Sequence, residues 1–76
     1  MKPYNGHRSW NAWNVSLWID NDEGLYNFAL DCLKRGKQDA GKAARLFMRD
    51  FAGDKTPDGA VYNHLSVKLA LAGLQE

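Results

Sequence analysis

Apolar residues recur at helical spacing in residues 9–20, which hold all three tryptophans of the chain. Trp10, Trp13 and Leu17 share one face at the i, i+3, i+7 spacing of an α-helix. Ser9 precedes this face as a candidate N-cap, because its side-chain oxygen can accept the first free backbone N–H groups. The pattern predicts a helix over residues 9–20 with its tryptophan face in the core.

A second apolar stripe and a rival strand pattern occupy the same stretch. Ala12, Val15 and Ile19 lie on the opposite side of the predicted helix. Residues 13–19 also alternate between apolar and polar, which is typical of a half-buried strand. A strand needs a partner, and only residues 65–71 offer a similar alternation. We therefore expect a helix here, with strands over these two ranges as the alternative.

The segment after this first helix has the clearest amphipathic pattern in the chain. Asp20 or Asn21 is the expected N-cap, and Asp22 and Glu23 then carry negative charge in the first turn, where the helix dipole favours it. Gly36 is a natural helix end. The predicted apolar face consists of Leu25, Phe28, Ala29, Cys32 and Leu33.

A third helix is predicted over residues 40–51, with Asp39 as its N-cap. Its basic residues Lys42, Arg45 and Arg49 lie nearly opposite the apolar face. That apolar face consists of Ala43, Ala44, Phe47 and Phe51.

Thr56 followed by Pro57 predicts the start of a fourth helix, because threonine caps well and proline is favoured at the first helical position. We expect this helix over residues 57–72. Val67 and Leu71 form a second apolar stripe on its other side. The face expected in the core consists of Val61, Leu65, Leu69 and Ala72.

The elements together predict an all-α fold, a compact bundle of about four short helices in a single domain over residues 1–76. Residues 1–8 contain Pro3 and a turn-forming Asn-Gly pair and are expected to form an irregular arm. The second apolar stripes of the first and fourth helices make a homodimer possible. The expected core consists of Trp10, Trp13, Leu17, Leu25, Phe28, Phe47, Val61, Leu65 and Leu69.

Composition supports a small globular protein without further refining its function. The 76 residues are 45% apolar and carry a net charge of +1, which gives no bulk argument for nucleic acid or a membrane surface. A single cysteine excludes an intramolecular disulfide and fits a reducing compartment. No apolar stretch has the length needed to span a bilayer. We expect a cytoplasmic protein.

The charges are unevenly placed along the chain. Residues 34–49 hold six Lys and Arg and one Asp, whereas the only charged residues over 20–31 are four acidic ones. The domain should therefore be dipolar. The expected partner-binding surface consists of Lys37, Lys42, Arg45 and Arg49, and the second candidate surface consists of Asp20, Asp22 and Glu23.

Neither a metal site nor a catalytic motif stands out in the sequence. His7, His64 and Cys32 do not have the spacing of a zinc motif. There is no nucleophile elbow and no phosphate-cradling glycine loop. We expect no metal and no cofactor, and we expect a protein that is not an enzyme. Cys32 lies on an apolar helix face and is interpreted as a buried structural thiol.

The second and third helices with their short connection have the lengths of a helix-turn-helix unit, and the third helix is basic. Lys37 and Gln38 of the connection would then join the helix cations in contacts to phosphates and bases. The competing interpretation is that these cations only solvate the outer face of an amphipathic helix.

Residues 4–6, 13–15 and 17–26 carry a recognisable motif, Tyr-Asn-Gly, Trp-Asn-Val and Leu-Trp-Ile-Asp-Asn-Asp-Glu-Gly-Leu-Tyr. It resembles a group of small proteins of phages and other bacterial mobile elements, which share a Trp-x-x-x-x-Trp core followed by Asn-Asp or Asn-Glu. Many of those proteins carry Thr just before the first Trp of the pair, where this chain has Ala12.

The resemblance implies a phage-encoded accessory protein of the bacterial host cell. Small phage proteins of this kind often inhibit host defence by binding, anti-CRISPR proteins among them. The first expectation is therefore a non-enzymatic inhibitor that binds a host protein complex, one that handles nucleic acid, through a charged face. A small nucleic-acid-binding regulator is the alternative, and a phage structural or assembly factor is the third.

Overall fold

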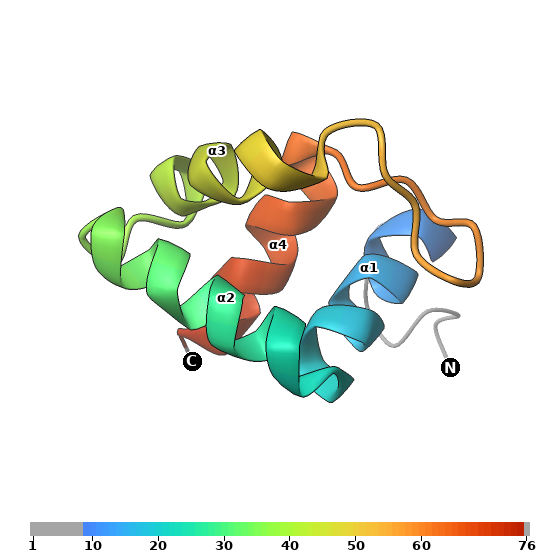
Figure 1. The fold of residues 1–76 in the computed structure, drawn as a ribbon, viewed down its shortest axis with the longest axis horizontal. Coiled ribbons are helices and arrows are strands. Elements are labelled where there is room, and N and C mark those ends of the chain that lie inside the picture. Colours follow the sequence, from blue (N-terminus) through green and yellow to red (C-terminus); the bar gives the residue numbers. More distant parts are fainter. Residues whose placement is uncertain (1–8, 76) are drawn as a thin grey trace.

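The computed structural model describes residues 9–75, which form four α-helices and no strand (Figure 1). α4 packs against α1 and α3, α2 packs against the same two helices, and α2 and α4 also touch each other. This confirms the predicted all-α bundle and excludes the strand alternative for residues 13–19 and 65–71. The arm predicted over residues 1–8 lies outside the described residues. The helices are α1 (Trp10–Asn21), α2 (Glu23–Arg35), α3 (Ala40–Phe51) and α4 (His64–Leu74).

Polar side chains cap the helices, mostly as predicted. Ser9 Oγ accepts from the N–H of Ala12 at 3.1 Å, and Asp39 caps α3. The prediction for α2 was wrong by one or two residues. α1 continues through Asn21, and the backbone becomes extended at the next residue, Asp22. The carboxylate of Asp22 therefore caps α2.

The core lies between all four helices and contains Phe47, which is fully buried. Its ring packs against those of Phe28 and Phe51, with centroid distances of 5.1 and 4.7 Å. Leu25 and Phe28 pack at the edge of this core, so they and Phe47 confirm part of the predicted set. Cys32 is buried as interpreted, and burial raises the pKa of its thiol.

The face of α1 that turns inward is the opposite of the one predicted. Ala12, Val15 and Ile19 are buried, whereas the side chains of Trp10 and Leu17 are 39% and 37% exposed. Trp13, also placed in the predicted core, is only half-buried. Small and β-branched residues let helices approach closely, and a tryptophan ring at the same position would hold them apart.

The fourth helix begins seven residues later than predicted. The structure uses Thr56 and Pro57 in a tight turn, in which the N–H of Thr56 bonds the carbonyl of Ala60 at 2.8 Å. Gly59 has a φ of 96°, a conformation that glycine adopts without strain. Asn63 caps the helix instead, and its side chain accepts from the N–H of Ser66 at 2.8 Å.

The inward face of α4 is also the opposite of the one predicted. Val67 and Leu71 are fully buried, while the side chain of Leu65 is 50% exposed and that of Val61 is 41% exposed. Leu69 is half-buried. The second apolar stripes of α1 and α4, which motivated the homodimer, therefore belong to the core of the single chain.

Candidate anion-binding pocket between α3 and α4

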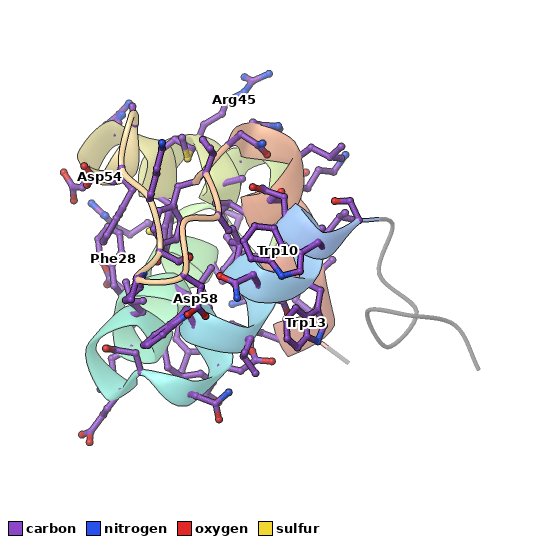
Figure 2. All side chains as sticks on the ribbon, turned by 90° about the vertical axis from the view of Figure 1, so that its right-hand side faces the viewer. Trp10, Trp13, Phe28, Arg45, Asp54 and Asp58 are labelled. Carbon is purple, nitrogen blue, oxygen red and sulfur yellow. The ribbon has the colours of Figure 1, made fainter. Side chains whose placement is uncertain are left out.

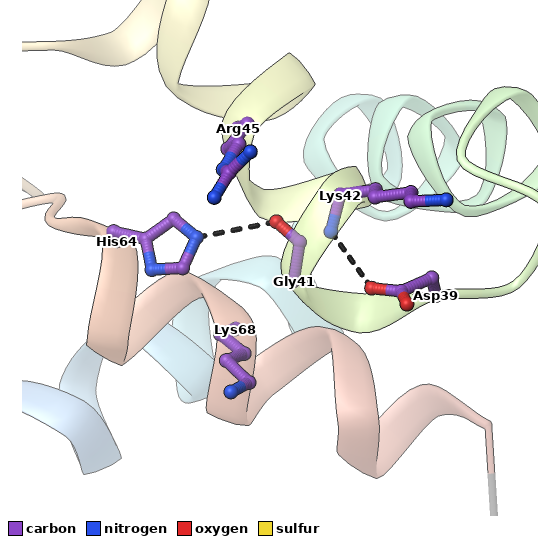
Figure 3. A pocket seen from close by; sticks show the side chains of 6 residues that line it. All are labelled: Asp39, Gly41, Lys42, Arg45, His64 and Lys68. Atoms are coloured by element: carbon purple, nitrogen blue, oxygen red, sulfur yellow. Dashed lines mark hydrogen bonds between the residues drawn. The ribbon is translucent and has the colours of Figure 1, made fainter.

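A pocket of about 310 Å³ opens between the first two turns of α3 and the N-terminal half of α4. Nearly every side chain around it is polar or charged, and no apolar side chain lines it (Figure 3). The lining residues are Asp39, Gly41, Lys42, Arg45, His64 and Lys68.

The α3 side of the pocket is built by the cap of the helix. Asp39 Oδ1 accepts from the N–H of Lys42 at 2.9 Å, and this bond lowers the pKa of the Asp39 carboxyl. The positive charges of Lys42 and Lys68 lower that pKa further. Gly41 leaves room for the carboxylate, since a Cβ there would lie 3.3 Å from Asp39 Oδ1. The aspartate is therefore ionised at neutral pH and forms one negative edge of the pocket.

His64 connects the two helices across the pocket. Its Nε2 lies 3.2 Å from the carbonyl oxygen of Gly41. Because a carbonyl oxygen can only accept, Nε2 carries the proton and donates this bond. The other ring nitrogen is then the acceptor in the neutral imidazole, and it becomes a second donor when the ring is protonated.

Three cations give the pocket its charge. Arg45 and Lys68 lie on either side of the bond between His64 and Gly41, and Lys42 extends on the side of Asp39 (Figure 3). Within residues 9–75, no ion pair includes any of the three; Arg35 pairs instead with Asp31 on α2, at 3.1 Å. The pocket therefore has a net charge of +2 with His64 neutral.

This arrangement favours binding of anionic oxygen atoms. Cationic donors from two helices line one recess, and hydrogen bonds from charged donors to carboxylate or phosphate are roughly twice as strong as neutral ones. Pockets that enclose small molecules are lined mainly by apolar side chains, unlike this one. Among the described residues, no group of three or more His, Cys, Asp or Glu could hold a metal ion.

The pocket contains half of the predicted binding residues and two that the sequence analysis did not place there. Lys42 and Arg45 line it, while Lys37 lies in the turn before α3 and Arg49 lies in the last turn of that helix. His64 and Lys68 come from α4 and were not predicted. They are four residues apart and thus share a helix face. Because the helix was predicted to start at residue 57, the sequence analysis did not place His64 at its N-terminus.

The second candidate surface lies at the junction of α1 and α2. Asp22 has a structural role there, because its Oδ1 accepts from the N–H of Leu25 at 3.0 Å. Glu23 occupies the first turn of α2, and Asp20 lies exposed near the end of α1. Because Asp22 is used to cap α2 and none of the three residues lines the pocket between α3 and α4, this junction is the weaker candidate.

Comparison with known proteins places the chain in a family. A family model matches residues 1–74. The chain belongs to DUF7249, a family of unknown function. No curated protein and no solved structure matches it. Among the described residues of this DUF7249 member, no helix has the length and apolar character needed to cross a membrane.

Proposed function

We propose that this protein is a non-enzymatic inhibitor encoded by a phage or another mobile element, and that it binds a host defence complex in the bacterial cytoplasm. The pocket between α3 and α4 is the contact surface in this proposal. The observation that carries it is that Lys42, Arg45 and Lys68 line one recess, and that none of them forms an ion pair within residues 9–75. The resemblance of the Trp-Asn motif to mobile-element proteins supports the biological setting.

An acidic surface of a protein suits the pocket better than nucleic acid does. Domains that bind nucleic acid are usually strongly basic, with an isoelectric point above about 9. This chain has an isoelectric point of about 7.9 and a net charge of +1. The Asp39 carboxylate at the pocket edge would also repel a phosphate backbone, whereas a protein surface can offer it a donor.

Nucleic-acid binding through α2 and α3 is the second candidate function. The connection between these helices is short, and Lys42, Arg45 and Arg49 lie exposed at i, i+3 and i+7 along α3. Cations on such a stripe can contact successive phosphates of a duplex. This candidate does not require Lys68 or His64.

Capture from lysate tests the first function against the second. The tagged protein is incubated with lysate of the bacterial strain that carries the gene, with and without nuclease. We expect a protein complex to be retained after nuclease treatment and lost when Lys42→Glu and Arg45→Glu are combined. Capture that disappears with nuclease would instead establish the nucleic-acid function.

A charge-matched variant controls for the change in net charge. Lys34→Glu with Lys55→Glu alters the net charge of the protein by the same amount at two exposed positions outside the pocket. This variant should capture the complex like the wild type. If both double variants lose the complex equally, general electrostatic attraction replaces the pocket as the explanation.

A further inference from the structure

The outer side of α4 carries an apolar row beside the pocket. Leu65, Leu69 and Ala72 follow one another along this side at spacings of three and four residues, and Val61 lies in the segment just before the helix. Val61 and Leu65 are among the most exposed large apolar residues described. Exposed apolar faces of this kind usually mark an interface.

A basic edge runs parallel to this row. His64 directly precedes Leu65 in the sequence, and Lys68 follows Leu65 by three residues. Both therefore lie on the neighbouring stripe of α4. Arg45 of α3 faces them across the pocket (Figure 3). α4 contains no acidic residue, so Lys68 is its charged side chain, and Asp39 of α3 is the one carboxylate that lines the pocket beside it.

We infer that the apolar row and the basic edge form one docking surface for an acidic amphipathic helix of a protein partner. Apolar side chains of that helix at i and i+4 would pack on Leu65 and Leu69, and its Asp and Glu residues would face Lys68 and Arg45. This inference rests on the proposed function and specifies the partner's chemistry.

Charge complementarity favours this occupant over the two alternatives. In a pair of copies related by a two-fold axis, with their α4 helices antiparallel, the two Lys68 edges would lie on the same side and repel each other. A nucleic-acid backbone would use the cations but would leave Leu65 without an apolar partner. An acidic amphipathic helix satisfies both halves of the surface.

A labelled synthetic peptide tests the inference by fluorescence anisotropy. The probe is a helical peptide with leucines at i, i+4 and i+8 and glutamates along one flank of that stripe. We expect saturable binding to the full chain, weakened about tenfold or more by Leu65→Ala and likewise by Lys68→Glu. Leu30→Ala and Lys34→Glu, which change exposed residues of α2, should leave the affinity unchanged.

Two altered peptides separate the apolar and the charged contributions. Replacing the leucines by serine, or the glutamates by glutamine, should each weaken binding by a similar factor. No saturable binding up to about 1 mM peptide would overturn the inference. Binding that responds to Lys68→Glu but not to Leu65→Ala would overturn it too, while leaving the proposed function intact.

Two further outcomes identify a different occupant and count against the inference. Light scattering that gives a dimer mass for the wild type and a monomer mass for Leu65→Ala would assign the surface to a second copy. Preference for a DNA oligonucleotide over the peptide would assign it to nucleic acid. Failure of the proposed function is recognised separately. In that case the Lys42→Glu, Arg45→Glu variant would capture the same proteins from lysate as the wild type.

Discussion

The hydroxyl group of Thr56 donates a 2.6 Å hydrogen bond to Asn14 Oδ1, and both side chains are buried. This bond attaches the loop before α4 to the middle of α1. Asn14 Nδ2 and the indole N–H of Trp18 both donate to Asp58 Oδ2, each at 2.9 Å. The loop is therefore held at a second point by Asp58, which Figure 2 shows beside α1. Because Asn14 and Trp18 face the loop, α1 must turn Val15 and Ile19 toward the core.

Thr56→Val should lower the free energy of unfolding by about 1–3 kcal/mol, because it leaves Asn14 Oδ1 and the N–H of Ala60 without their partner. Valine keeps the shape of threonine, so packing changes little. Thr56→Ser retains the hydroxyl group and is the matched control. Urea denaturation of both variants measures the effect, and equal stabilities for them would contradict a role of the hydrogen bonds.

Acid should release the loop tip from α1. The bonds from Asn14 and then Trp18 lower the pKa of Asp58, so its folded pKa lies below its unfolded value of about 3.9. The stabilisation is therefore complete above the unfolded value and is lost as pH falls through the folded pKa. The NMR shift of the Trp18 indole proton should follow this titration with a midpoint below about 3.9. A midpoint above that value would contradict the hydrogen-bond geometry.

Asp58→Asn provides the control for this titration. The amide oxygen can still accept from Trp18, but it no longer titrates. The acid-dependent shift of the indole proton should therefore disappear. A shift that persists in the variant would come from another carboxyl group and would contradict the assignment of the titration to Asp58.

Truncation variants should show which apolar side chains form the core. Phe47→Ala should cost about 3–5 kcal/mol of unfolding free energy, because this ring is fully buried and packs against two other phenylalanines. Leu65→Ala should cost about 1 kcal/mol or less, since half of its side chain is already exposed. If thermal or urea denaturation showed the same loss of unfolding free energy for both variants, Leu65 would have to be buried in the core.

Sequence patterns predicted the helices well where one apolar face was dominant. α3 begins and ends at the predicted residues, because Asp39 and the Ala43 to Phe51 face leave no competing interpretation. α1 and α4 each carry two apolar faces, and periodicity alone cannot say which face meets the core. Side-chain size suggested that the face of α1 with Trp10 and Trp13 meets the core. Asn14 and Trp18 bind the loop instead, and this turns the opposite face of α1 inward.

The late start of α4 and the pocket share one cause. Pro57-Asp58-Gly59 is a turn signal as strong as Thr56-Pro57 is a helix start, and the buried hydroxyl group of Thr56 favours the turn. Once α4 begins at His64, that residue and Lys68 come to lie beside Arg45. Such a juxtaposition depends on the packing of α4 against α3, which no local pattern encodes.

The claim that the pocket between α3 and α4 serves inhibition of host defence is tested most directly by plating a phage that the host normally restricts. Host cells expressing the wild-type protein should permit plaques, as should cells expressing the Lys34→Glu, Lys55→Glu control. Cells expressing the Lys42→Glu, Arg45→Glu variant at equal protein level should restrict the phage again. Full plaque formation with the pocket variant, or none with the wild type, would contradict the claim.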